Sequence, residues 1–112
     1  LHAMLPEAPD DVENPEKFVD SGIESLLDEM DRRGADLHSI EAKLTGGSSM
    51  LDLGGNESVG DKNVRAAKRV LSEHGIDIVA EETGGGSGRS ISFRPATGVL
   101  TIKRVDAQPR DI

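Results

Sequence analysis

The chain has 112 residues and no cysteine, and its 21 acidic and 13 basic side chains give a net charge of −8. This length fits one domain, and without cysteine, residues 1–112 hold no disulfide, no thiolate metal site and no cysteine nucleophile. The acidic balance argues against nucleic acid or an anionic membrane as a partner, because both are bound through clustered Lys and Arg. No apolar run approaches the roughly 20 residues that cross a bilayer, so we expect a soluble, cytoplasmic protein without membrane insertion.

The first five residues, Leu-His-Ala-Met-Leu, predict a short strand that ends at Pro6. His2 lies inside this apolar run, where a histidine is a candidate buried general base because imidazole exchanges protons near neutral pH. Considered alone, a histidine in such a place is more often structural than catalytic. A strand that starts at residue 1 without an initiator methionine also suggests a chain that was cut upstream.

A helix is predicted over residues 15–33, after an acidic loop at residues 7–14. Asn14 can cap its start, Pro15 suits the first turn, and Gly34 suits the left-handed position after its end. Apolar residues recur at helical spacing along it, namely Val19, Ile23, Leu26, Leu27 and Met30.

The middle of the chain predicts a strand, a polar loop and a second helix. Residues 37–45 alternate between apolar and polar side chains, with His38 on the apolar side. A polar loop follows, and the second helix covers residues 61–73. Its inward face consists of Val64, Ala67, Val70 and Leu71.

The last third of the chain predicts three strands and a tail. Residues 76–82 form a strand, residues 83–88 a glycine-rich turn, and residues 89–94 and 99–105 a hairpin. Residues 106–112 are polar and are expected to fray. The order strand–helix–strand–helix–strand–strand–strand predicts an α/β fold, a layered sandwich of two helices on a mixed sheet.

Two segments invite a ligand-binding interpretation that their surroundings do not favour. Residues 84–89 are glycine-rich like a phosphate loop, but strand-like residues follow where a phosphate loop would begin a helix. The acidic loop side chains Asp52, Asn56, Glu57 and Asp61 do not have the spacing of an EF-hand. His38 and His74 have no partner at ligand spacing. We therefore predict no metal site and no cofactor.

Seven segments taken together are more specific than any one of them. They lie at residues 2–6 (His-Ala-Met-Leu-Pro), 41–50, 59–64 (Val-Gly-Asp-Lys-Asn-Val), 82–85 (Glu-Thr-Gly-Gly), 88–91 (Gly-Arg-Ser-Ile), 93 and 97–98. Their order and spacing resemble CheD, the chemoreceptor glutamine deamidase family of bacterial and archaeal chemotaxis. The resemblance covers nearly all of the 112 residues.

The resemblance implies an enzyme, a protein-glutamine glutaminase that hydrolyses side-chain amides on methyl-accepting chemotaxis receptors. In this family a cysteine attacks the amide, a histidine takes the cysteine proton, and a threonine orients the histidine. His2 corresponds to the family histidine and is the one catalytic residue that carries over, as general base. The nucleophilic cysteine and the orienting threonine belong to a Gly-Ser-Cys segment and the residues before it, which we expect upstream of this chain. The turns at residues 46–47 and 84–85 match positions that shape the domain.

The resemblance also implies a domain plan and partners. Residues 1–105 would form a CheD-like deamidase domain that lacks its N-terminal strands, and residues 106–112 would form a polar C-terminal tail. The expected partners are the methyl-accepting chemotaxis receptors and the CheC phosphatase.

Two alternatives stay open. A chain that is naturally this short would be a non-catalytic module that binds CheC or receptors, since it lacks the nucleophilic cysteine. Its missing strands would leave an unpaired sheet edge and poor solubility, which favours a fragment of an active deamidase. An unrelated acidic ligand-binding domain would require every segment match to be coincidental.

Overall fold

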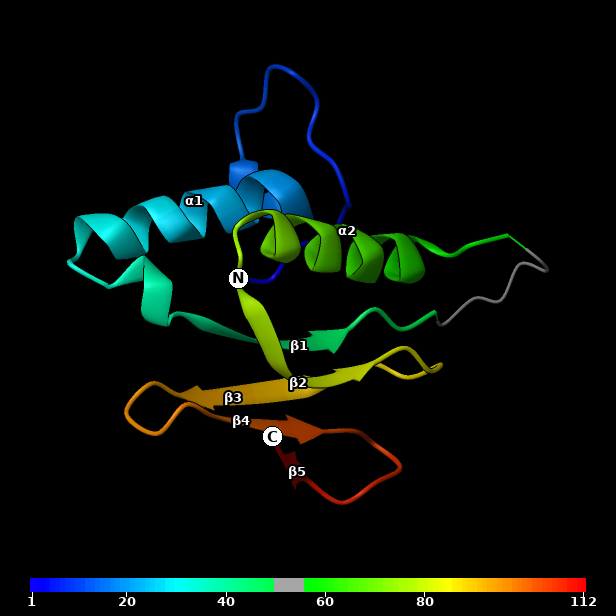
Figure 1. The fold of residues 1–112 in the computed structure, drawn as a ribbon. Helices are drawn as coiled ribbons and strands as arrows, with labels where there is room; N and C mark the ends of the chain where they lie inside the picture. The colour runs from blue at the N-terminus through cyan, green and yellow to red at the C-terminus, as the bar shows by residue number, and fades with distance from the viewer. Residues whose placement is uncertain (50–55) are drawn as a thin grey trace.

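Two helices lie together on one side of a pair of parallel strands (Figure 1). This computed structural model describes residues 1–49 and 56–112. Helix α1 spans Val19–Arg32 and helix α2 spans Val59–Glu73. The strands are β1 (Glu41–Gly46) and β2 (Asp77–Thr83), and α2 is the connection between them. A parallel pair needs such a crossover, so the β1–α2–β2 order sets the middle of the fold.

An antiparallel sheet lies on the other side of the β1–β2 pair (Figure 1). It consists of β3 (Ser90–Arg94), β4 (Val99–Lys103) and β5 (Arg110–Asp111), in that order. Lys43 of β1 joins the two sheets, since its Nζ donates to the carbonyls of Gly98 and Ile112 at 2.5 and 2.7 Å.

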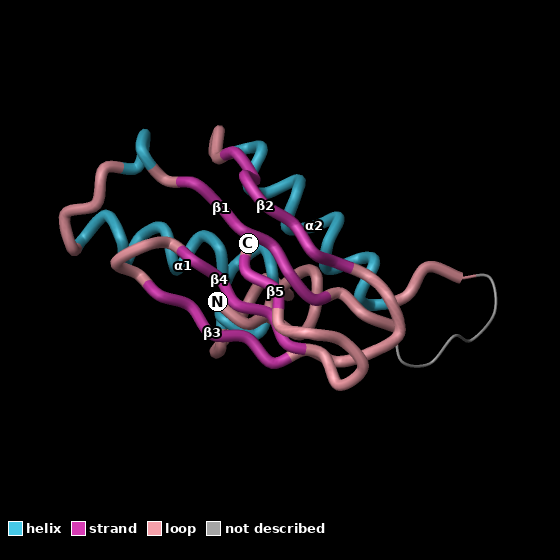
Figure 2. Tube along the Cα trace, turned by 90° about the horizontal axis from the view of Figure 1, so that it is seen from below, coloured by secondary structure: helices cyan, strands magenta, loops and turns pink. Residues whose placement is uncertain are grey.

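Seen from below, the strands lie in front of both helices (Figure 2). The predicted α/β sandwich of two helices on strands is therefore confirmed. The parallel and antiparallel pairings belong to two separate sheets among the described residues.

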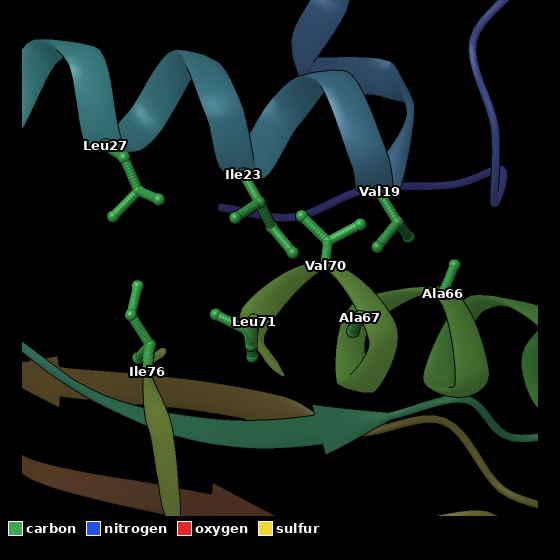
Figure 3. Packing of buried hydrophobic residues seen from close by; sticks show 8 residues of the cluster. All are labelled: Val19, Ile23, Leu27, Ala66, Ala67, Val70, Leu71 and Ile76. Carbon is green, nitrogen blue, oxygen red and sulfur yellow. The ribbon is translucent and has the colours of Figure 1, made fainter. Parts of the chain in front are cut away.

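The main core lies between the two helices and the β1–β2 pair. Val19, Ile23 and Leu27 recur every fourth residue on α1 and point toward α2, where Val70 faces them (Figure 3). The buried residues of this core are Val19, Ile23, Leu27, Ala66, Ala67, Val70, Leu71 and Ile76. Each large aliphatic side chain buried in this way stabilises the fold by about 1.5–3 kcal/mol. Because these apolar residues recur at helical spacing, their burial stabilises both helices.

The first helix begins later than the sequence predicts. Pro15–Lys17 form a 3₁₀ turn, Phe18 is extended with φ −111° and ψ 143°, and α1 starts at Val19. Phe18 is extended because it forms an isolated parallel bridge with Leu5. Asn14 makes no side-chain capping hydrogen bond, so its predicted role as cap is wrong.

The strand predicted at residues 37–45 is shorter than expected. Residues 37–39 form a 3₁₀ turn because the Asp36 carboxylate accepts from the His38 N–H at 3.0 Å and from the Ser39 hydroxyl at 2.9 Å. His38 is consequently exposed on this turn and does not lie on the apolar side of a strand.

The second helix begins two residues before its predicted start. Ser58 and Asp61 form a capping box, in which the Asp61 N–H donates to the Ser58 hydroxyl at 3.0 Å and the Ser58 N–H to the Asp61 carboxylate at 3.3 Å. A capping box satisfies two N–H groups that would otherwise lack partners, which fixes the start of α2.

The C-terminal residues are paired, contrary to the frayed tail predicted at 106–112. Arg110 and Asp111 form β5 beside β4. Ile112 and Leu100 exchange two backbone hydrogen bonds, of 2.9 and 3.1 Å. The β3–β4 hairpin is confirmed, with Arg94 opposite Val99.

Candidate functional site

Residues 1–7, here called the His2 segment, are held against the start of α1 without forming a strand. The N–H groups of Met4 and Leu5 both donate to the Lys17 carbonyl, at 2.9 and 3.2 Å, and the Val19 N–H donates to the Leu5 carbonyl at 2.8 Å. The strand predicted at residues 1–5 is therefore wrong. Its backbone groups bond to the turn before α1, and within the described part of the chain no strand lies beside it.

His2 itself is exposed, and none of the described residues gives its imidazole a hydrogen bond or an ion pair. The residues on either side of His2, in contrast, pack against the rest of the fold. Ala3 packs against the main core, and Leu1 lies against Gly22 of α1. The histidine expected in a buried strand is thus a surface residue between two anchored ones.

Helix α2 also holds this segment. Asn63 Nδ2 donates to the Met4 carbonyl at 3.1 Å, and Arg69 forms an exposed ion pair with Glu7 at 3.6 Å. The other end of the Asn63 amide, Oδ1, is buried and has no hydrogen-bond partner in the described structure. Sequence reasoning missed Asn63, although it lies within residues 59–64, one of the segments that carry the family resemblance.

Two glycine-rich turns meet where β1 and β2 end. The Gly84 N–H donates to the Gly46 carbonyl at 2.9 Å, and the Ser49 N–H donates to the Gly85 carbonyl at 2.9 Å. Gly46 and Gly84 have φ angles of 105° and 83°, a region that side chains disfavour. Both turns therefore shape the backbone at this edge. Residues 84–89 lead from β2 to a strand, as predicted, and no helix follows them.

The buried Arg89 side chain joins the two glycine-rich turns by hydrogen bonds. Its guanidinium donates to the carbonyls of Gly46 and Gly84, at 3.3 and 2.8 Å, and to the Glu82 carboxylate at 2.9 Å. The side chains of Arg89 and Glu82 are only 4% and 11% exposed. The hydrogen bond from Arg89 holds the pKa of the Glu82 carboxyl below its ordinary value, against the opposing effect of burial.

The other polar candidates have structural partners. Glu57 forms an ion pair with Arg65, and Asp61 caps α2. His74 lies at the end of α2 with its Nε2 2.9 Å from a Glu24 oxygen. Asp52 lies outside the described residues.

Replacing Gly60 by alanine should destabilise the protein, although helices usually favour alanine over glycine by about 1 kcal/mol. A Cβ on Gly60 would lie 2.5 Å from the Gly47 carbonyl oxygen and 2.8 Å from that of Ser48. Both are backbone atoms that cannot rotate away, so we expect a loss of about 1–3 kcal/mol in the free energy of unfolding, measured in urea. The control is Gly22→Ala in α1, where a Cβ would meet the flexible end of Leu1 at 2.9 Å. Equal losses for both variants would contradict this interpretation.

Charge is divided unevenly over the fold. Residues 7–31, the loop before α1 and most of α1, contain ten of the 21 acidic side chains and one of the 13 basic ones. The remaining residues contain 11 acidic and 12 basic side chains. Three cations of α2 line an open depression of about 400 Å³ beside the His2 segment; the lining residues are Pro6, Glu7, Lys62, Arg65, Ala66 and Arg69.

Residues 4–104 match the family model described as CheD chemotactic sensory transduction. The chain belongs to the CheD family. A probable chemoreceptor glutamine deamidase CheD from Natronomonas pharaonis is 40% identical over 111 residues, covering 96% of this chain and 66% of that protein. One from Haloarcula marismortui is 42% identical over 105 residues, covering 92% and 61%. The chemoreceptor glutamine deamidase CheD of Thermotoga maritima is 36% identical over 104 residues, covering 93% and 66%.

The chain thus spans 61–66% of the length of these three CheD relatives. The family resemblance predicted from the sequence is confirmed. His2 precedes the matched residues 4–104, and its catalytic role stays a prediction. Neither helix in the described part of this CheD chain has the length and hydropathy needed to cross a membrane.

Proposed function

We propose that this chain is part of a deamidase that converts glutamine side chains of methyl-accepting chemotaxis receptors into glutamates. The observation that carries the proposal is membership of the CheD family, in which relatives 36–42% identical to this chain are named chemoreceptor glutamine deamidases. The reaction is hydrolysis of a side-chain amide.

In the proposed mechanism His2 is the general base. It takes the proton of a cysteine thiol, the thiolate attacks the amide carbon of glutamine, and the same proton passes to the departing ammonia. Water then hydrolyses the thioester, which releases glutamate and restores the thiol. The exposure of His2 supports this role, because the target amide belongs to another protein and must reach the imidazole.

We propose that the thiol and the threonine that orients His2 come from polypeptide outside residues 1–112. Two facts support this for the thiol, and the family resemblance is what implies the same for the threonine. These residues contain no cysteine, and the chain spans 61–66% of the length of the relatives compared above. We further propose the cytoplasm as its location and CheC as a second partner, which the family resemblance implies.

A second candidate function is a non-catalytic module that binds receptors or CheC. The observation that favours it is again the absence of cysteine, because the covalent route needs a nucleophile. In that case the chain would bind receptor peptides without releasing ammonia.

The test compares the 112-residue chain with a polypeptide extended by the coding sequence directly upstream. We expect an in-frame Gly-Ser-Cys segment there, ammonia release from receptor glutamines by the extended protein, and none by the chain alone. Mass spectrometry of the receptor identifies the glutamates formed. An in-frame stop codon close to Leu1, or equal activity of the two proteins, would contradict the proposal.

A further inference from the structure

We infer that Asn63 is a positioning residue that ties the His2 segment to α2 and thereby holds the imidazole in place. This inference rests on the proposed role of His2. Asn63 lies 59 residues from Met4 in sequence, and its Nδ2 donates to the Met4 carbonyl at 3.1 Å.

The contacts of Met4 show what this hydrogen bond adds. The Met4 and Leu5 N–H groups bond to the Lys17 carbonyl, which fixes the segment to the turn before α1. The Met4 carbonyl is instead fixed to α2 by Asn63. The peptide group between Met4 and Leu5 is therefore held between the turn before α1 and helix α2.

The face of α2 that carries Asn63 is itself fixed. Gly60 lies three residues before Asn63, one turn away on that face, and its backbone lies against Gly47 of the turn after β1. Asn63 thus projects from a part of the helix that is packed against backbone. A hydrogen bond from such a rigid position can define where the segment lies.

The unused end of the amide argues against a packing role. Asn63 Oδ1 is buried without a hydrogen-bond partner in the described residues. An unpaired buried acceptor opposes folding, whereas leucine has a similar volume and no such penalty. Filling this space alone would therefore be done better by an apolar side chain, and the hydrogen bond to Met4 is what asparagine adds.

The position of the base matters because proton transfer needs hydrogen-bond reach. A displacement of about 1 Å in a catalytic group can cost roughly 100-fold in rate. His2 has no hydrogen bond to another described residue, so its place depends on its backbone neighbours. Asn63 fixes one of these neighbours, Met4, through the hydrogen bond to its carbonyl.

The first arm of the test uses the 112-residue chain and amide hydrogen exchange followed by NMR. Asn63→Leu should accelerate exchange at the Met4 and Leu5 amides by roughly two- to tenfold, the effect of losing one hydrogen bond. Amides in the middle of α1, such as Ile23, should be unchanged. The matched control is Arg69→Ala, which removes the exposed ion pair with Glu7 from the same segment. Unchanged exchange in Asn63→Leu, or the same acceleration in Arg69→Ala, would overturn the inference.

The second arm uses the extended, cysteine-containing polypeptide. Asn63→Leu should lower kcat for receptor deamidation at least about tenfold with KM within twofold, because the base is displaced while receptor binding remains. Asn63→Gln, which keeps the amide donor, should recover part of the rate. An unchanged kcat, or a rise in KM alone, would contradict the positioning role. An extended protein without any activity would instead contradict the proposed function, and the exchange arm would still decide whether Asn63 holds the segment.

Discussion

Replacement of Arg89 by alanine should lower the free energy of unfolding by about 3 kcal/mol, measured by urea denaturation. Removing one partner of a buried ion pair costs roughly 3–5 kcal/mol because the remaining charge is left without compensation. We place this variant at the lower end because Arg104 stays 3.6 Å from the Glu82 carboxylate. The change also removes hydrogen bonds to the Gly46 and Gly84 carbonyls, which join the two glycine turns.

The control is Arg33→Ala, which removes an ion pair of nearly the same length. Arg33 Nε lies 2.8 Å from Glu29 Oε1, but the two side chains are 79% and 51% exposed. Exposed pairs of this kind contribute roughly 0–1 kcal/mol. If both variants lose the same stability, burial is not what makes the Arg89 pair important.

The loss in Arg89→Ala should shrink in acid. Because the pKa of Glu82 is lowered in the folded protein, the pair stabilises the fold above the unfolded glutamate pKa of about 4.3. That contribution is lost as the pH falls through the folded pKa. The stability difference between wild type and variant should therefore shrink as the pH falls below about 4.3. The part that remains is due to the hydrogen bonds from Arg89 to the Gly46 and Gly84 carbonyls, which do not titrate. A constant difference across that range would contradict an electrostatic origin.

Replacement of His2 by alanine in the extended polypeptide should lower kcat for receptor glutamine deamidation by about 10²–10⁴-fold, the usual contribution of a general base. The expected loss is in kcat because the imidazole acts on the thiol and the leaving ammonia. Ammonia release at saturating receptor is the measurement. The stability of the protein should change little, since the His2 side chain is exposed.

His38→Ala is the matched control for this experiment. His38 is also an exposed histidine, but it lies on the turn before β1. It should retain full activity. Wild-type rates in His2→Ala would contradict the assignment of the base, and equal losses in both variants would point to a general effect of removing histidines.

The two helices and the strands β1 to β4 could be predicted because apolar spacing decides them. Val19, Ile23 and Leu27 on α1, and Val70 and Leu71 on α2, are the residues that pack in the core. Such periodicity is present in the sequence itself and needs no information about distant contacts. The α/β class follows from the order of the periodic segments.

The incorrect predictions have two causes, a backbone partner distant in sequence and a local side chain that competes for backbone hydrogen bonds. Residues 1–5 are not a strand because their partner is the Lys17 carbonyl, and Phe18 is not helical because it pairs with Leu5. Asp36 turns residues 37–39 away from β1 through its own hydrogen bonds. None of these contacts leaves a periodic pattern.

The site could be predicted in part. The family resemblance points to His2, whose catalytic role stays a prediction, and hydrogen bonds from the Met4 and Leu5 N–H groups to the Lys17 carbonyl hold its segment. The burial of Arg89 and the hydrogen bond of Asn63 could not be found, because each depends on residues 7 to 59 positions away. Both residues lie in segments that carry the family resemblance, and this membership is the only feature of the sequence that pointed to them.

The uneven distribution of charge gives the molecule an electric dipole. The loop before α1 and α1 itself form its negative end, and the rest of the fold is close to neutral with cations on α2. A dipole experiences torque in the field of an approaching partner, within a screening length of about 8 Å at physiological salt. An acidic partner would therefore meet α2 and the strands before it meets α1. The orientation at first encounter then varies with ionic strength.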